Sequence, residues 1–186
     1  MVTSVAVVGL GNILFGDEGL GVYALKYLEA NYRLPDEVTL LDGAVLGFGL
    51  MPVLHEYERT LVVSSAFIGT RPGEITLSDA EAFMAKGAVR KSANEAELTM
   101  MLEICAFSDA IGGVELVTMV PASIDKVRTH LSKTVADALP HMVERLIARL
   151  RDFGITVEKK KAHTDVADIV AMYANPTHRT LHTSAG

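Results

Sequence analysis

The hydrophobic residues of this chain fall into two alternating patterns. Short apolar runs, which are typical of buried strands, alternate with stretches in which apolar residues recur every three or four positions, as on one face of a helix. The predicted strands lie within residues 4–10, 38–41, 60–67, 71–79 and 112–121. The predicted helices lie within residues 19–32, 47–57, 92–107 and 127–154. This alternation predicts a three-layer α/β fold, with helices on both faces of a mostly parallel central sheet.

Local signals refine the helices. Pro52 is compatible with a helix that starts beside it, whereas Pro140 interrupts the long amphipathic stretch before Gly154, which suits a helix C-terminus. Ser92 followed by Glu95 forms a capping box at the start of helix 92–107. Further along that helix, Met100 and Met101 are expected to pack in the core, the commoner role of methionine at such positions.

The chain divides at about residue 156. Residues 1–156 carry the alternating pattern and are predicted to form a single α/β domain. Residues 157–186 contain a run of lysines and a polar, turn-rich end, so we expect a flexible C-terminal tail with one short helix at 165–173.

Composition narrows the classes of function. The chain has 186 residues, of which 49% are hydrophobic, and its formal net charge is −6. An acidic chain argues against nucleic acid or an anionic membrane surface as the main partner. No apolar run reaches the length of a membrane span, so no membrane insertion is expected. The single cysteine, Cys105, allows no intrachain disulfide and fits a cytoplasmic location.

The stretch "VVGLGNILFGDEGLGV" places a glycine-rich turn between the first strand and the first helix. Such turns often hold phosphates, but Asp17 and Glu18 stand where the helix begins and would repel a pyrophosphate. No Lys-Ser/Thr pair follows the glycines, which excludes a P-loop. The carboxylates favour a cation. The alternative is that Glu18 only stabilises the helix N-terminus. Under both interpretations, the positive end of the helix is expected to lower the cost of keeping the Glu18 carboxylate ionised.

Further polar residues follow the later strands. Asp42 ends the second predicted strand, and Ser64 and Ser65 lie near the end of the third. Ligands of parallel sheets bind beyond the carboxyl ends of the strands. We therefore expect these residues to share one cleft with Glu18. Because Ser64 and Ser65 lack a Gly-x-Ser-x-Gly elbow and a nearby histidine, a serine hydrolase is excluded.

The segment "GLGNILFGDEGLGV" closely resembles the opening motif of the nickel–iron hydrogenase maturation endopeptidases. The resemblance extends over most of residues 4–152 and includes "LLDGA", the apolar run before Ser64, "SANEAE" and "VELVTMVP". It implies an α/β fold and, as partner, the large-subunit precursor of a nickel–iron hydrogenase. It also implies recognition of nickel already inserted in that precursor, followed by removal of the precursor's C-terminal peptide.

The same resemblance implies three residues that contact the metal. Glu18 matches the first, which is a Glu in the family. Ser64 matches the second in an ungapped reading (Ser65 if the strand shifts by one), where the family has Asp. Asn94 matches the third, where the family has His. Neutral Ser and Asn oxygens are poor ligands for nickel. We therefore expect the nickel to be carried by the substrate and to bind the free protein only weakly. Asp42 matches an acid that the family also carries and is a candidate catalytic residue.

Nearby carboxylates offer compensation for the neutral pair: Asp17, Glu95 and Glu97. The leading hypothesis is an endopeptidase that uses Glu18 and Asp42. The alternative is a catalytically silent family member that binds the precursor as a chaperone or scaffold. A small-molecule module that uses the glycine loop is disfavoured by its acids. Whether the chain is an enzyme depends on Ser64 and Asn94.

Overall fold

The computed structural model describes residues 4–44, 47–86, 92–107 and 113–174. Its central sheet has five strands in the order β3-β1-β4-β6-β5. All neighbours pair in parallel except β5 and β6, which pair antiparallel. The strands are β1 (Val5–Leu10), β3 (Val38–Ala44), β4 (Arg59–Ser65), β5 (Ile75–Asp79) and β6 (Val114–Met119). The predicted fold class, a mostly parallel sheet within an α/β fold, is confirmed.

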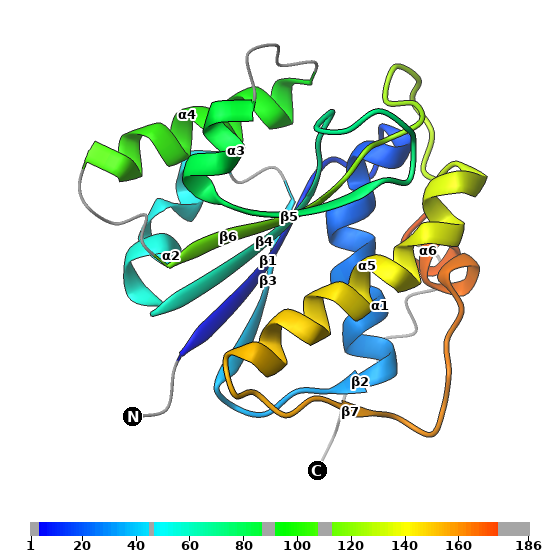
Figure 1. Ribbon diagram of the computed structural model, residues 1–186. Coiled ribbons are helices and arrows are strands. Elements are labelled where there is room, and N and C mark those ends of the chain that lie inside the picture. The colour runs from blue at the N-terminus through cyan, green and yellow to red at the C-terminus, as the bar shows by residue number, and fades with distance from the viewer. Residues whose placement is uncertain (1–3, 45–46, 87–91, 108–112, 175–186) are drawn as a thin grey trace.

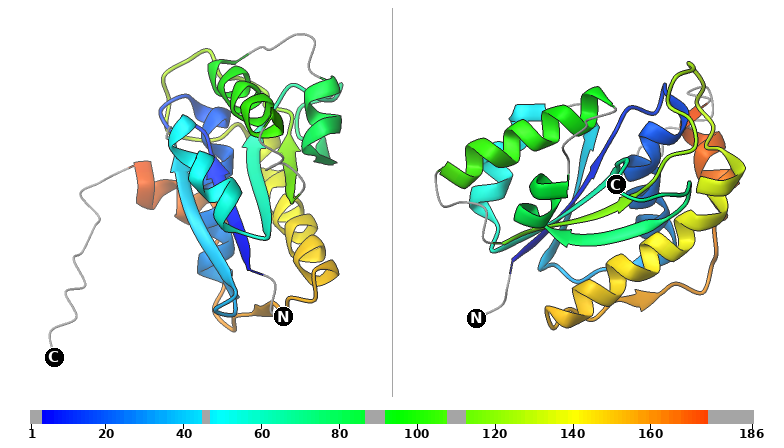
Figure 2. Two further views of the ribbon diagram at one scale, coloured as in Figure 1. Left: turned by 90° about the vertical axis from the view of Figure 1, so that its left-hand side faces the viewer. Right: turned by 45° about the horizontal axis from the view of Figure 1, so that its top comes forward.

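Helices cover both faces of the sheet (Figure 1). One layer holds η2 (Gly47–Leu50), α2 (Met51–Glu56), α3 (Ala80–Lys86) and α4 (Ala93–Phe107). The other holds α1 (Leu20–Asn31), α5 (Lys133–Asp152) and α6 (Val166–Ala174). The two views of Figure 2 show the sheet between these layers. Helix α3 was not predicted. None of the helices in the described ranges is both long enough and apolar enough to cross a membrane.

The core consists of two hydrophobic clusters, one on each face of the sheet. All six residues of β1 are buried, which explains why this strand reads as a continuous apolar run. Alternate residues of the strands enter opposite clusters: Leu61 and Val63 pack with α1 and α5, whereas Val62 packs with α4. This alternation decides which polar side chains can meet at the strand ends.

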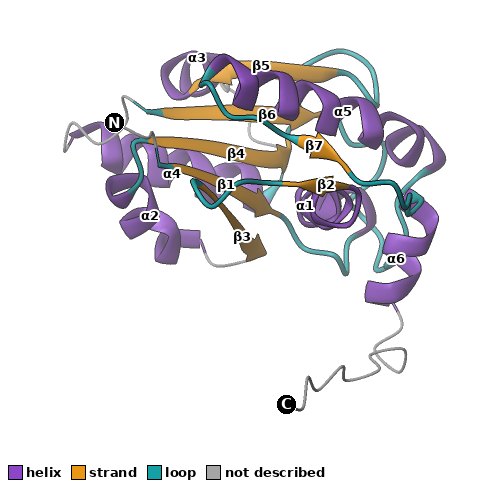
Figure 3. Ribbon diagram, turned by 90° about the horizontal axis from the view of Figure 1, so that it is seen from below, coloured by secondary structure: helices purple, strands orange, loops and turns teal. Residues whose placement is uncertain are grey.

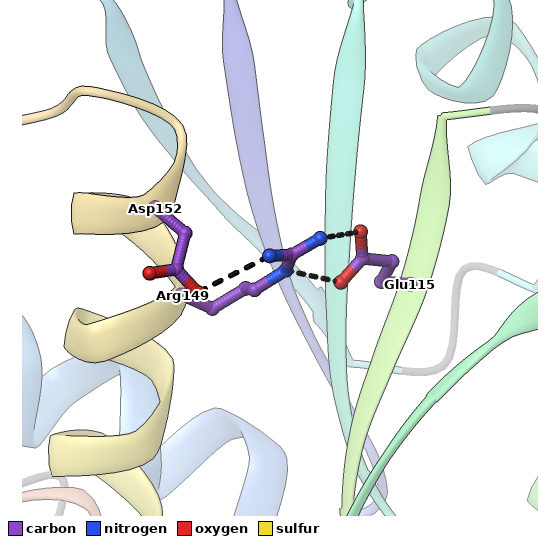
Figure 4. Close-up of polar contacts among 3 residues, drawn as sticks. All are labelled: Glu115, Arg149 and Asp152. Atoms are coloured by element: carbon purple, nitrogen blue, oxygen red, sulfur yellow. Dashed lines mark hydrogen bonds and ion pairs between the residues drawn. The ribbon is translucent and has the colours of Figure 1, made fainter.

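Helix α5 tolerates the proline that was expected to interrupt it. Pro140 lies inside the helix. The side chain of Ser132 caps the N-terminus of α5 by accepting a hydrogen bond from the Val135 amide. Near the other end, Arg149 donates two hydrogen bonds to Glu115 of β6, at 2.6 and 2.7 Å, and a third to Asp152 at 3.2 Å (Figure 4). This bidentate pair ties the helix to the sheet, and it raises the pKa of Arg149 above its ordinary value.

The first half of the expected tail packs against the domain. Strand β7 (Glu158–Lys159) pairs antiparallel with β2 (Tyr32–Arg33), and α6 follows beside α1 (Figure 3). Ile169 and Val170 of α6 are buried in the same cluster as α1. The predicted short helix is therefore present. The expectation that this part of the chain adds little to the core is wrong, because α6 presents an apolar face that α1 covers. Residues 175–186 of the predicted tail lie outside the described residues.

Candidate active site

The glycine-rich stretch forms a tight turn whose backbone lies against its own later residues. It runs from β1 through the 3-10 helix η1 (Gly16–Gly19) into α1. Gly11 has φ of +132°, and a Cβ there would lie 1.8 Å from the carbonyl oxygen of Glu18. A Cβ on Gly21 would lie 2.2 Å from the carbonyl oxygen of Val63. The glycines thus allow close backbone contact, which brings Glu18 to the carboxyl end of the sheet.

Asp17 fixes this turn to the loop after β6. Its side chain is fully buried and accepts hydrogen bonds from the amides of Ala122, Ser123 and Ser132, at 2.9, 3.1 and 2.6 Å. A buried carboxylate needs such partners to offset its desolvation. Asp17 therefore holds the loop that follows β6 in place and is not available as a ligand.

Glu18, in contrast, is half-buried and lines the pocket described below. Burial raises the pKa of its carboxyl above the ordinary value of 4.5. The sequence suggested that the helix N-terminus eases ionisation of Glu18, whereas the shift found here is upward and its cause is burial. The carboxyl lies in the short η1 turn before α1.

Ser64 and Asn94 meet at the end of β4. The Asn94 side-chain amide donates a hydrogen bond of 3.1 Å to the Ser64 hydroxyl, which in turn donates to the carbonyl of Ser65 at 3.2 Å. Because strand residues alternate between faces, Ser64 lies on the α4 side together with Val62, whereas Ser65 lies on the opposite side. The contact therefore pairs Asn94 with Ser64 and not with Ser65. The Ser64 side chain is fully buried, so it supports Asn94 from beneath.

A pocket of about 470 Å³ joins the turn, the start of α4 and the loop after β6. Glu18 and Asn94 both line it, as the sequence predicted, and Glu97 and Asp125 add two more acidic residues. The described residues that line it are Asn12, Phe15, Glu18, Ser92, Ala93, Asn94, Glu97, Ile124 and Asp125. None of these described residues is basic, so this part of the lining suits a cationic group.

The two glutamates near Asn94, Glu95 and Glu97, lie in different environments. Glu95 is buried, and its carboxylate accepts a long hydrogen bond of 3.5 Å from the Phe67 amide. Its own amide donates to the Ser92 hydroxyl at 3.0 Å, which is one half of the predicted capping box. Glu97 instead lines the pocket. The sequence did not single out the loop residues Ile124 and Asp125, although they follow β6 at the carboxyl edge where ligands bind.

Asp42 lies outside this pocket, contrary to the expectation of a shared cleft. In the sheet it pairs with Gly9, which also pairs with Val63, so Asp42 faces the same side as Val63 and the opposite side from Ser64. Its carboxylate is half-exposed and lies 3.9 Å from the ammonium of Lys26 on α1. The contact that the structure assigns to Asp42 is therefore this ion pair.

The donor set does not fit a metal held by the protein alone. Within the described ranges, no three His, Cys, Asp or Glu side chains come together as a metal-binding group. The Ser64 hydroxyl and the Asn94 amide are already engaged with each other. Glu18 is the remaining anionic group among the three expected contacts, and a single carboxylate is a weak site for nickel.

A mostly parallel sheet with an acidic pocket at its carboxyl edge defines an α/β protein whose candidate ligand site lies beside the first βα turn. Comparison with known proteins identifies the family. The family profile described as "Hydrogenase maturation protease" matches residues 22–149. The chain therefore belongs to the hydrogenase maturation protease family.

Individual relatives agree with this assignment. The hydrogenase expression/formation protein HupD of Bradyrhizobium diazoefficiens is 30% identical over 163 residues, which cover 85% of this chain and 83% of that protein. The hydrogenase 2 maturation protease of Escherichia coli is 28% identical over 164 residues, 87% of this chain and 99% of that protein. The solved structure of the hydrogenase maturating endopeptidase HybD from E. coli superposes with a TM-score of 0.77 at 26% identity, covering 84% of this chain and 97% of that one.

Proposed function

We propose that this protein recognises the nickel-loaded large-subunit precursor of a nickel–iron hydrogenase and hydrolyses one peptide bond to remove the precursor's C-terminal peptide. Membership in the maturation protease family supports the reaction class. The observation that carries the proposal is the acidic pocket at the end of the sheet, which Glu18 and Asn94 both line.

The residues of the pocket then have distinct roles. Glu18 supplies an anionic oxygen to the nickel that arrives with the precursor, and Glu97 and Asp125 keep the pocket negative. Asn94, held by Ser64, forms the neutral wall. The precursor's nickel supplies Lewis-acid chemistry toward the scissile carbonyl or water. Because that metal belongs to the substrate, a protein with one anionic ligand can act on it without a metal site of its own.

The test is C-terminal processing of purified precursor, followed by mass spectrometry. The parent protein should shorten the nickel-loaded precursor and leave the nickel-free precursor intact. Glu18→Gln should abolish shortening and weaken binding of the nickel-loaded precursor at least about tenfold, with little effect on the nickel-free form, because a carboxylate–metal contact is lost. Glu29→Gln is the matched control, since that exposed carboxylate lies on α1.

The pH dependence gives the same test a second measurement. Glu18 must be ionised to bind nickel, and burial raises its pKa, so binding of the nickel-loaded precursor should weaken as the pH falls through that raised pKa. Glu18→Gln should lose this dependence. If the variant binds and processes as the parent does, Glu18 has no role in the reaction. If the parent binds the nickel-loaded precursor and leaves its length unchanged, the protein is a binding partner of the precursor and not a protease.

A further inference from the structure

Helix α4 carries three large apolar side chains that face solvent. Met100, Ile104 and Phe107 are 53%, 43% and 94% exposed, whereas the neighbouring Met101 and Leu102 are buried. The core position predicted for Met101 is confirmed, and that predicted for Met100 is wrong. Single exposed apolar residues are ordinary, but a contiguous apolar patch marks an interaction site. In Figures 1 and 2, α4 lies at the outside of its layer, and no described element covers its outer face.

This stripe begins at the pocket. Residues 97, 100, 104 and 107 are separated by three, four and three positions, which places them on one face of a helix. Glu97 is the member of this series that lines the pocket. The remaining three continue the same face, so that Phe107 lies about 15 Å along the helix axis from Glu97, given a rise of about 1.5 Å per residue. The apolar stripe, defined as Met100, Ile104 and Phe107, is thus continuous with the site where the precursor's C-terminal region is proposed to bind.

The charges around the stripe indicate the chemistry of its partner. Glu97 and Glu103 accompany it on α4, and the helix has no Lys or Arg. A second copy of α4 placed against this face would bring like charges together. A partner segment with an apolar face bordered by Lys or Arg would instead satisfy both features. Methionine adapts its shape to such a segment more readily than branched residues do.

We propose that the apolar stripe of α4 is the docking surface for the large-subunit precursor, and that it binds an apolar segment bordered by basic residues. This proposal rests on the proposed function. The stripe contacts the precursor independently of nickel, whereas Glu18 contacts it through nickel. The two contacts therefore make separable contributions to affinity.

The experiment measures the dissociation constants of full-length protein for nickel-loaded and nickel-free precursor. The variant Ile104→Ser/Phe107→Ser should weaken binding of both forms by about tenfold or more, because it removes two apolar contacts. Leu77→Ser/Met172→Ser is the matched control, because both side chains are exposed apolar residues outside α4, and it should bind as the parent does. Glu103→Lys should weaken both forms too. Circular dichroism and melting temperature establish that each variant is folded.

The outcomes separate the two proposals. If the parent processes the precursor and the α4 variant binds it as tightly as the parent, the docking surface is wrong and the function stands. If the parent binds neither form, the function fails and the docking assignment fails with it. An equal loss of precursor affinity in the control variant also overturns the docking surface. So does a self-association, measured by sedimentation, that the α4 variant abolishes while its affinity for the precursor is unchanged. A photo-crosslinker at position 104 should label an apolar precursor segment with flanking Lys or Arg.

Discussion

Asp17 and Glu18 are adjacent carboxylates with different environments, and the difference sets what each can do. The Asp17 carboxylate accepts hydrogen bonds from three backbone amides of the loop after β6, so it fixes the turn. Glu18 is half-buried at the pocket, where burial raises its pKa. Across the pocket, Asn94 is held by the buried Ser64 hydroxyl at 3.1 Å. Of the three residues expected to contact the metal, one is therefore anionic and two are neutral.

This residue-scale arrangement predicts how metal affinity can be gained. Ser64→Asp combined with Asn94→His replaces two neutral groups with a carboxylate and an imidazole, the donors that nickel prefers. The double variant should bind nickel at least about tenfold more tightly than the parent in calorimetry, if the parent's weakness lies in these two donors. Adding Glu18→Gln to the double variant should reverse the gain. Tight nickel binding by the parent with no gain in the double variant would show that the ligand assignment is wrong.

At the scale of elements, α1 packs unusually close to the sheet because glycine leaves room for its backbone. A Cβ on Gly21 would lie 2.2 Å from the carbonyl oxygen of Val63 and 2.3 Å from that of Leu10, so it would meet backbone atoms of both β4 and β1. Backbone in the centre of a sheet cannot move aside as a flexible side chain can. The close approach also determines where η1, and with it Glu18, lies relative to the strand ends.

Gly21→Ala should therefore destabilise the protein by about 3 kcal/mol, since overpacking against fixed backbone forces the helix away from the sheet. Gly154→Ala is the matched control. Gly154 has φ of +84° but nothing within 4 Å of a Cβ, so only backbone strain of about 1 kcal/mol is expected. Urea unfolding measures both. Equal losses in the two variants would show that the close approach carries no energy beyond backbone conformation.

At the scale of the whole molecule, the chain after α5 closes the α1 side of the core. The Asn31 side chain accepts from the Thr164 amide at 2.8 Å and donates to the Thr164 carbonyl at 3.0 Å, so it joins the end of α1 to the segment before α6. Ile169 and Val170 then complete the hydrophobic cluster. Residues 158–174 are part of the packed structure, although they begin with a run of charged residues.

Truncation should reveal this contribution. A chain that ends at Val157 loses the burial of Ile169 and Val170, each worth about 1.5–3 kcal/mol. Relative to a chain that ends at Ala174, its melting temperature should fall by on the order of 10 °C, at about 2–4 °C per kcal/mol for a protein of this size. Both chains lack residues 175–186, so the difference reports residues 158–174. Melting temperatures within about 2 °C of each other would contradict the packing of α6.

The sequence by itself determined the order and type of most elements, the parallel character of the sheet and the position of Glu18 beyond the first strand. Periodicity and glycine placement report local backbone structure, so they predict these features well. The match of Asn94 to a site residue also followed from sequence, through the resemblance of its segment to the family.

Only the tertiary structure decided which of the polar residues at the strand ends meet. Asp42 and Ser64 both follow apolar runs, yet the register through Gly9 turns them to opposite faces of the sheet. The raised pKa of Glu18, the exposure of Met100 beside buried Met101 and the packing of α6 were likewise decided there. Each of these depends on contacts between segments far apart in the chain. Periodicity reports which residues share a face of one element, and only packing determines what that face meets.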